Sequence, residues 1–221
     1  MSNSETIYRA LARLSEKYNP DSETTILRNY AMVFDPFGLV DIPELGLKTN
    51  TEYITKELDW YKSQSLNVNT LRDTPKIWRQ VCDSRNHIHS NYGFLIFNSF
   101  NGNQYDNVLK ELTNNPTSRR AVMYYTNPMM HYIGNKDHIC TLAVVYYIDK
   151  RTINCSVIMR SQDIIFGLLN DLPWQQWVLK RLAVDLGNIY AVGDIHWFCV
   201  NLHIYKRHYK YLEMIRRKYD N

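Results

Sequence analysis

Two short runs of β-branched and aromatic residues, Thr141 to Ile148 and Ile153 to Met159, most constrain what this 221-residue chain can fold into. Residues of these types favour strands. The polar tetrapeptide Asp149-Lys150-Arg151-Thr152 separates the two runs, which is the pattern of a β-hairpin with a short turn. We therefore expect the chain to be organised around this pair of strands.

Polar, reactive residues stand at the ends of these two runs. Cys140 precedes the first, and the second gives way to Arg160-Ser161-Gln162-Asp163. A buried strand end would not carry a cation, a hydroxyl and a carboxylate unless something polar docked there. The sequence therefore predicts a ligand site at this point. Gly167 then allows the backbone to bend, and Pro173 is expected to open a helix as its first residue.

Length and composition indicate one domain. A chain of 221 residues with 45% hydrophobic content can bury one substantial core, so we expect a single domain over residues 1–221. The mixture of helical and strand patterns predicts an α+β fold, with helices gathered against a mostly antiparallel sheet. The net charge of +4 suits a phosphorylated small molecule and falls short of a basic stripe made for nucleic acid.

The cysteines and the apolar runs indicate the cellular compartment of the protein. The four cysteines show no C-x-x-C spacing, and the N-terminal sequence has no signal-peptide pattern. The longest nearly apolar run, Cys140 to Ile148, has nine residues, whereas a membrane-spanning helix needs about 20. We expect a soluble, cytoplasmic protein.

One carboxylate is out of place in a predicted helix. Over residues 51–65, a rotation of 100° per residue puts Ile54, Leu58 and Tyr61 on one apolar arc, and Glu57 falls inside that arc. A carboxylate among apolar neighbours needs a reason. It pairs with a buried arginine, or it is a catalytic or water-ordering group, and the pattern favours neither.

Other polar residues admit two interpretations each. His87 and His89 have no third ligand at a suitable spacing, which favours loop histidines over a zinc site, and no metal is expected. Asn91-Tyr92-Gly93 predicts a turn into a strand. Arg119 and Arg120 directly precede a predicted strand, where they indicate either anion binding or an interface, or are two ordinary surface arginines.

The C-terminal third continues this pattern. On a predicted strand over residues 195–205, Asn201, His203 and Tyr205 alternate onto one face, which indicates a sugar-binding edge or simply an exposed face. Residues 206–219 predict a basic, solvated helix, with a nucleic-acid role as the weaker alternative.

Several motifs together resemble the thymidylate synthase superfamily, over roughly residues 52–208. They are Arg119-Arg120, Cys140, Arg160-Ser161-x-Asp163, Gly167 and His203-Ile204-Tyr205. Within the superfamily the chain most resembles phage-type deoxycytidylate hydroxymethylases, through Glu57 to Leu66, Thr74 to Trp78, Ser90 to Gly93, Asn115 to Arg120 and Gly167 to Asp171. Each motif alone is weak, but their joint order is specific.

The resemblance implies the superfamily's mixed, mostly antiparallel sheet flanked by helices, and it implies a chemistry. Cys140 would attack ring carbon 6 of a pyrimidine, which makes carbon 5 nucleophilic toward the one-carbon unit of methylenetetrahydrofolate. Glu57 would manage water and protons. Asp171 falls where the synthases read the base with asparagine, and an ionised aspartate offers only acceptors, which favours cytosine. The plainer alternative is that Asp171 caps the helix predicted to begin at Pro173.

The resemblance also implies binding roles and a homodimer. Arg160 and Ser161, with Arg119 and Arg120 donated by a partner subunit, would hold the phosphate; His203 and Tyr205 would bind the sugar; Ile77, Trp78 and Asp163 would lie by the folate, and Tyr92 by Cys140. Arg28 is a candidate for a further phosphate arginine, because the synthases' N-terminal Arg-Thr-Gly loop is absent.

Two departures from the synthases limit what the resemblance implies, and the second, the missing closing tail, argues against hydride transfer. Ile139-Cys140-Thr141 replaces Pro-Cys-His, and residues 216–221 replace a short apolar closing tail. We therefore expect dCMP, methylenetetrahydrofolate and water to give 5-hydroxymethyl-dCMP and tetrahydrofolate, in a phage DNA-modification pathway in the host cytoplasm. The alternatives are a dCMP methyltransferase, a dUMP hydroxymethylase or thymidylate synthase, and, more remotely, a non-catalytic nucleotide- or RNA-binding protein. Cys140, Glu57 and Arg160 together favour an enzyme, because a binding module needs no nucleophile.

Overall fold

The computed structural model describes residues 1–71, 73, 75–127, 129 and 132–219 of the chain. Contacts among these residues divide the chain into two units. The first unit comprises residues 1–49 and 150–221, and the second comprises residues 50–149. Each unit is described separately below.

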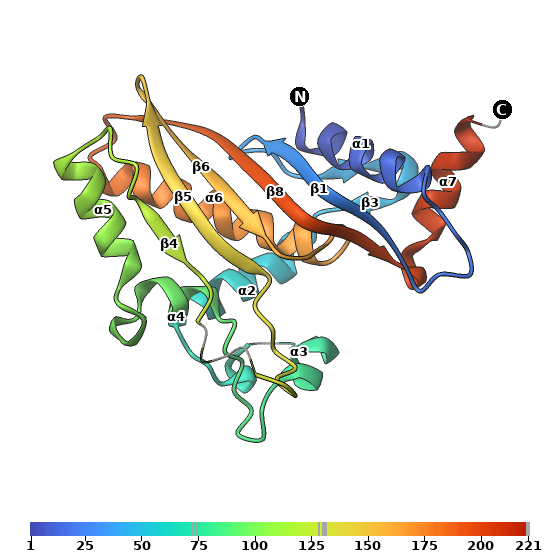
Figure 1. Ribbon diagram of the computed structural model, residues 1–221, viewed down its shortest axis with the longest axis horizontal. Helices are drawn as coiled ribbons and strands as arrows, with labels where there is room; N and C mark the ends of the chain where they lie inside the picture. Colours follow the sequence, from blue (N-terminus) through green and yellow to red (C-terminus); the bar gives the residue numbers. More distant parts are fainter. Residues whose placement is uncertain (72, 74, 128, 130–131, 220–221) are drawn as a thin grey trace. The chain divides into compact units, whose positions relative to one another are not determined.

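The first unit is built on the long strand β8 (Ala191–Tyr205). Antiparallel to it runs β1 (Thr24–Phe34), while β6 (Thr152–Met159) and the short β7 (Gln162–Asp163) pair with it in parallel (Figure 1). Buried and more exposed residues alternate along most of β6 and β8, as expected of strands that pack one face into a core. The sheet of this unit is therefore mixed.

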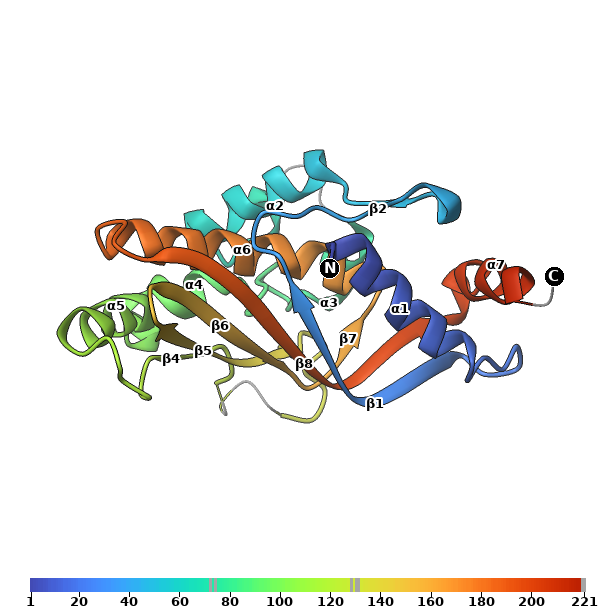
Figure 2. The ribbon, with the colours of Figure 1, turned by 90° about the horizontal axis from the view of Figure 1, so that it is seen from above.

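Three helices among the described residues complete the first unit. They are α1 (Asn3–Ser15), α6 (Gly167–Asp185) and α7 (Lys210–Tyr219). Helix α6 runs along β6 and β8 (Figure 2), and α1 packs against β1 and α7. A short hairpin of β2 (Asp41–Ile42) and β3 (Leu47–Lys48) encloses the 3₁₀ turn η1 (Pro43–Leu45), and a second such turn, η5 (Lys206–His208), precedes α7.

The expectation of a solvated C-terminal helix is only half right. Tyr211, Leu212 and Ile215 on α7 are buried, and the basic residues occupy the remaining face. Their spacing of one, three and four residues produces an apolar stripe that packs in the first unit, as in any amphipathic helix.

The predicted start of α6 is wrong. The helix begins at Gly167, and Pro173 lies inside it. Although an interior proline removes one backbone hydrogen bond, the residues before it are already helical and bury Leu168, Leu169 and Leu172. Asp171 is therefore inside the helix, and it does not cap a helix that begins at Pro173.

Over its described residues, the second unit combines helices with one strand pair. Its helices are α2 (Thr51–Ser63), α3 (Lys76–Val81), α4 (Tyr92–Phe97) and α5 (Gln104–Asn114), with 3₁₀ turns η2 (Val68–Thr70) and η3 (Ser99–Asn101). β4 (Val122–Tyr124) pairs antiparallel with β5 (Thr141–Asp149). Helix α4 packs against α2 and α5, and α5 packs against β4. The bounds of β5 and β6 agree with the two runs that predicted strands.

The predicted turn and strand at Asn91-Tyr92-Gly93 are wrong, because this segment begins helix α4. The Asn91 side chain caps the helix, accepting a hydrogen bond from the Phe94 backbone N–H at 2.9 Å. A Cβ on Gly93 would lie 1.7 Å from the backbone oxygen of Tyr61. The glycine therefore permits close approach of α4 to α2, which the sequence alone presents as a turn signal.

Among the helices of the described residues, none is both long enough and apolar enough to cross a bilayer.

Candidate active site

Cys140 stands immediately before β5, in the second unit, and is half-buried. Its thiol lies 3.8 Å from the His138 carbonyl oxygen, a weak hydrogen bond. The next residue, Thr141, is buried and donates its hydroxyl hydrogen to the Tyr92 hydroxyl oxygen at 3.0 Å. Tyr92, on α4, is thereby tied to the residue that adjoins Cys140.

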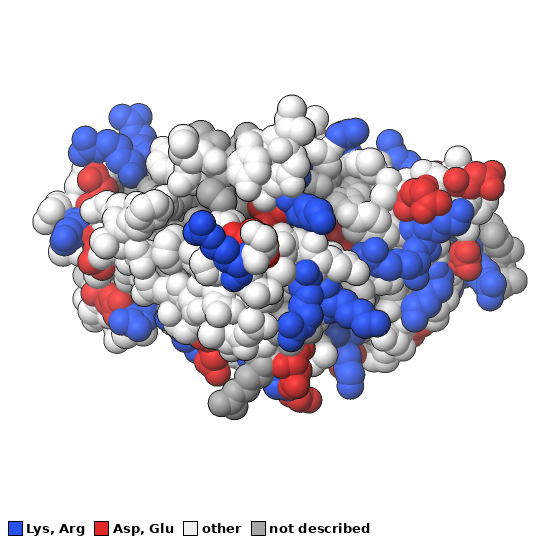
Figure 3. Space-filling view, turned by 90° about the horizontal axis from the view of Figure 1, so that it is seen from below, with Lys and Arg blue, Asp and Glu red and all other residues white. Residues whose placement is uncertain are grey.

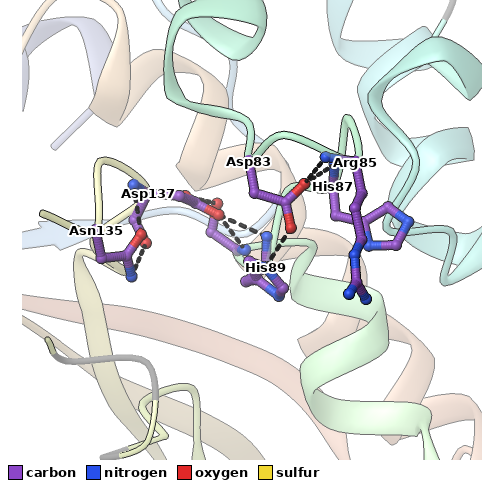
Figure 4. Close-up of polar contacts among 7 residues, drawn as sticks. Asp83, Arg85, His87, His89, Asn135 and Asp137 are labelled. Atoms are coloured by element: carbon purple, nitrogen blue, oxygen red, sulfur yellow. Dashed lines mark hydrogen bonds and ion pairs between the residues drawn. The ribbon is translucent and has the colours of Figure 1, made fainter.

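A buried carboxylate fixes the segment that leads to Cys140. Asp137 is 6% exposed and accepts hydrogen bonds from the backbone N–H groups of His89 and Ser90, at 2.6 and 2.9 Å, and from the Ser90 hydroxyl at 2.6 Å (Figure 4). The Asn135 side chain accepts from the Asp137 backbone N–H at 3.0 Å. Sequence reasoning missed Asp137, since its partners lie 47 and 48 residues away.

The two histidines singled out in the sequence belong to the same loop. Asp83 accepts from the His87 backbone N–H at 2.8 Å, and its carboxylate lies 3.4 Å from the His89 ring (Figure 4). The hydrogen bond from the His87 backbone, with others from this loop, lowers the pKa of Asp83. Within the described ranges, no cluster of three or more His, Cys, Asp or Glu residues is arranged to hold a metal ion.

Glu57 on α2 is 3% exposed, so the burial predicted from its place on the helical arc is confirmed. Its Oε1 accepts a hydrogen bond of 2.6 Å from the Tyr53 hydroxyl. That hydroxyl in turn accepts from the Trp78 indole Nε1 at 2.9 Å. Sequence reasoning missed Tyr53, although its position four residues before Glu57 on a helix was a signal for such a contact.

The predicted folate residues of the second unit lie on α3. Trp78 meets Trp60 edge to face, with ring centroids 5.5 Å apart, and Ile77 is 57% exposed. The motif that begins at Thr74 is described only in part, because Thr74 lies outside the described residues.

Arg119 and Arg120 are both exposed, between α5 and β4. Arg120 forms an ion pair with Glu111 at 3.2 Å, and Ser118 donates to the same carboxylate. The Ser118 hydrogen bond, followed by the charge of Arg120, lowers the pKa of Glu111. The two arginines therefore present cations on the surface of the second unit.

In the first unit, β8 and the segment after β6 bring polar groups together. Asn201 donates from its side-chain amide to the Arg160 carbonyl oxygen at 2.7 Å. The Ser161 hydroxyl lies 3.4 Å from Nδ1 of His203. Burial lowers the pKa of His203, so its imidazole is neutral near pH 7. The predicted alternation of Asn201, His203 and Tyr205 on β8 is confirmed.

Asp163 and Tyr205 share a basic neighbour. Asp163 accepts from the Ile165 backbone N–H at 3.0 Å and lies 3.9 Å from the Arg207 guanidinium. That guanidinium sits 4.3 Å from the centre of the Tyr205 ring, within the range of a cation–π contact. Arg28, exposed on β1, is the register partner of Asn201 on β8, so both side chains emerge on the same side of the sheet.

Asp171 on α6 is held by a residue that the sequence did not single out by itself. Its Oδ2 accepts a hydrogen bond of 2.8 Å from the side-chain amide of Gln162. Burial raises the pKa of Cys199 on β8 to about 12, and the negative charge of Asp171 adds to this effect. Asp171 is therefore half-buried and close enough to β8 to act on Cys199.

The two units thus carry different chemistry. The second contains a thiol with an adjacent tyrosine and a buried carboxylate with its own hydrogen-bond chain. The first contains a strand face of hydrogen-bonding groups beside Arg160 and a carboxylate held by an amide. A thiol, a buried carboxylate and clustered hydrogen-bonding groups are side-chain types that catalytic sites use.

Comparisons with known proteins agree on one family. A family model described as thymidylate synthase matches residues 15–221. The chain is 45% identical over 181 residues to deoxycytidylate 5-hydroxymethyltransferase of Enterobacteria phage T4, and this match covers 77% of the chain and 74% of the relative. It is 25% identical over 206 residues to thymidylate synthase of Vesicomyosocius okutanii, a match that covers 86% of the chain and 73% of the relative. The structure resembles thermostable thymidylate synthase A from Bacillus subtilis, with a TM-score of 0.75, 23% identity and coverage of 97% and 84%, a likeness of fold.

Proposed function

Because the chain belongs to the thymidylate synthase family, we propose that it transfers a one-carbon unit to carbon 5 of dCMP and releases it as a hydroxymethyl group. The substrates are dCMP, methylenetetrahydrofolate and water, and the products are 5-hydroxymethyl-dCMP and tetrahydrofolate. The observation that carries this proposal is the similarity to the phage T4 deoxycytidylate 5-hydroxymethyltransferase over most of both chains. We also propose that residues 1–221 form one domain of this family, because the family match extends through both units.

Cys140 is the proposed nucleophile. Its thiolate adds to carbon 6 of the pyrimidine, and the electron pair of the 5,6 double bond becomes available at carbon 5. Its half-buried position before β5 supports this role. Cys155 and Cys199 are poor alternatives, because burial raises the pKa of each thiol far above neutrality.

Glu57 is the proposed water- and proton-handling group. Its carboxylate is buried and hydrogen-bonded to Tyr53, so it can hold a water molecule in a fixed direction and take a proton from it. Carbon 5 loses its proton as tetrahydrofolate leaves, that water adds to the resulting exocyclic methylene group to give the hydroxymethyl group, and Cys140 then leaves carbon 6.

Separate sets of residues are proposed to bind the phosphate and the sugar of the nucleotide. Arg160 and Ser161, with Arg119 and Arg120 of a partner subunit, bind the phosphate, and His203 and Tyr205 bind the sugar. The exposed, cationic ends of Arg119 and Arg120 support this role, and Arg28 is a further candidate because of its register with Asn201. Asp171 accepts from the amino group of cytosine. Its place inside α6 removes the alternative that it caps a helix beginning at Pro173.

The co-substrate supplies the one-carbon unit as a methylene group when it is bound. Ile77 and Trp78 fit this role, because an exposed apolar side chain and an indole next to the Tyr53 hydroxyl suit a flat, partly apolar molecule. Asp163, in the first unit, is the proposed polar contact. Tyr92 holds the segment at Cys140 through Thr141.

We propose a homodimer as the working state. The sheet of the first unit exposes Val33 on β1 and Phe198 on β8, at 45% and 39% of their surface. A second copy would remove these neighbouring apolar groups from water. Mixing a Cys140→Ala chain with an Arg119→Ala, Arg120→Ala chain tests the exchange of arginines. Activity that exceeds that of either variant alone supports it.

The non-catalytic RNA-binding alternative has less support. Lys and Arg side chains lie next to Asp and Glu at the end of the first unit where α7 is found (Figure 3). Lys206 and Lys218 are within 4 Å of carboxylates, at 3.7 Å from Glu23 and 3.9 Å from Glu44. These pairs reduce the positive field that a nucleic-acid backbone requires.

A single incubation tests the proposed function. The protein is mixed with dCMP carrying tritium at carbon 5 and with methylenetetrahydrofolate. We expect release of tritium, a product with the mass of 5-hydroxymethyl-dCMP and no dihydrofolate absorbance. Stoichiometric dihydrofolate with a methylated product would instead identify a methyltransferase or a thymidylate synthase.

A further inference from the structure

The side chain of Gln162 is placed unusually for a buried glutamine. It lies on the two-residue strand β7, is 2% exposed, and donates its amide hydrogen to Oδ2 of Asp171 at 2.8 Å. At the other end of the amide, Oε1 is buried and has no hydrogen-bond partner among the described residues. An unpaired buried carbonyl oxygen destabilises a fold. An apolar side chain of the same length would avoid this cost, so stability alone does not explain a glutamine here.

The Gln162 amide can face the Asp171 carboxylate with only one of its two ends. If the amide were reversed, its carbonyl oxygen would face the Asp171 carboxylate, and two acceptors would repel each other. The NH₂ end therefore faces Asp171. A donor to a carboxylate stabilises the ionised form and restricts its rotation, and such charge-assisted hydrogen bonds are the stronger class.

The backbone nearby leaves room for this amide. A Cβ on Gly167, the first residue of α6, would lie 2.7 Å from Nε2 of Gln162 and 3.4 Å from Cβ of Asp163. A side chain at Gly167 would therefore push the amide away from its present position. Gly167 and Gln162 are thus fitted to each other, and Asp171 follows on the next turn of the same helix.

We propose that Gln162 is a positioning residue for specificity: it holds the Asp171 carboxylate in one orientation and in its ionised, acceptor-only form. The inference rests on the proposed function, in which Asp171 accepts from the amino group of cytosine. Without the amide, Asp171 loses one donor to its ionised form, so it takes up a proton more readily and is less restricted in orientation. A protonated carboxyl group donates a hydrogen bond, so it tolerates the carbonyl oxygen that uracil has in place of the amino group.

Two variants act on this contact from opposite sides. Gln162→Met keeps the length of the side chain and removes the donor. Gly167→Ala keeps Gln162 but displaces its amide. The matched control is Gln176→Met on α6, the helix that carries Gly167 and Asp171. Gln176 is 4% exposed and donates to the carbonyl oxygens of Asp35 and Gly38, at 3.0 and 2.7 Å. This control removes a buried glutamine amide that does not bind Asp171.

The readout is the ratio of dissociation constants for dCMP and dUMP, measured by calorimetry on the full-length protein, together with the ratio of kcat/KM. We expect Gln162→Met and Gly167→Ala each to lower the preference for dCMP by about tenfold, as is typical for loss of one hydrogen bond to a charged group. Gln176→Met should lower the stability of the protein and keep the wild-type ratio. If the role of Gln162 were merely structural, Gln162→Met would behave in the same way.

The outcomes separate this inference from the proposed function. A folded Gln162→Met protein with the wild-type ratio overturns the inference and leaves the function intact. If Gln162→Met does not fold, the ratio in Gly167→Ala decides in the same way. Wild-type protein that binds dCMP preferentially but does not release tritium overturns the function alone, and wild-type protein with no preference for dCMP overturns both.

Discussion

The Tyr53 hydroxyl donates a 2.6 Å hydrogen bond to Oε1 of Glu57, one turn further along α2. The same hydroxyl accepts from the Trp78 indole at 2.9 Å, so its only hydrogen is directed to the carboxylate. A buried carboxylate needs such a partner, and the short contact fixes the direction in which Glu57 can hold water.

Tyr53→Phe should therefore impair the step that uses this water. Loss of one hydrogen bond to a buried charged group costs about 1.5 to 3 kcal/mol, or roughly 10- to 100-fold in rate if it acts in the transition state. Formation of 5-hydroxymethyl-dCMP, followed by mass, should fall more than release of tritium from carbon 5. Tyr18→Phe is the control, because it removes a tyrosine–glutamate hydrogen bond of 2.7 Å to Glu213 in the other unit. Equal losses in both variants would contradict a specific role for Tyr53.

Cys140→Ser should abolish release of tritium from carbon 5 and leave binding of dCMP within a few-fold of wild type. The alkoxide needed for attack is far less accessible from serine than a thiolate is from cysteine. Tritium release and calorimetry measure the two properties. Cys82→Ser, which replaces another half-buried cysteine, should retain activity. Normal turnover by Cys140→Ser would refute the assignment.

Asp171→Asn should shift the preferred substrate from dCMP toward dUMP. The amide introduced by this substitution can donate to the carbonyl oxygen of uracil, while its oxygen still accepts from Gln162. A buried acceptor left without a donor costs on the order of 1 to 3 kcal/mol, which corresponds to roughly 10- to 100-fold in the ratio of kcat/KM values. Competition between the two nucleotides measures this ratio. The argument fails if wild-type protein already processes dUMP as efficiently as dCMP.

The stability of the protein should decrease as the pH falls below about 6.5. Burial lowers the pKa of His203 and of His208, so near that pH an unfolded histidine, with its usual pKa of about 6.5, binds protons that the folded one does not. Acidification therefore favours the unfolded chain. Urea unfolding at pH 7.5 and pH 5.5 measures the difference, and His203→Gln should reduce it. His138→Gln, at an exposed position, is the control, and an equal reduction there would contradict the prediction.

The sequence was sufficient for features that depend on local order. Runs of β-branched and aromatic residues around a polar turn placed β5 and β6, because such residues favour strands. Helical spacing placed Glu57 on a buried face, because burial repeats with the period of the helix. The joint order of the motifs identified the family. The beginnings of α4 and α6 were mispredicted, since glycine and proline signal turns locally while packing on α2, or burial of leucines, kept the chain helical.

Only the tertiary structure decided which polar groups meet. Asp137 and Ser90 are 47 residues apart, and Trp78 reaches Tyr53 across 25 residues. Gln162 and Asp171 are close in sequence but lie on a strand and a helix, whose relative placement no local pattern specifies. A hydrogen bond depends on distances of a few tenths of an ångström, and periodicity fixes only the face on which a residue lies. The sequence therefore determined which faces are buried, and the packing of helices against strands determined the partners.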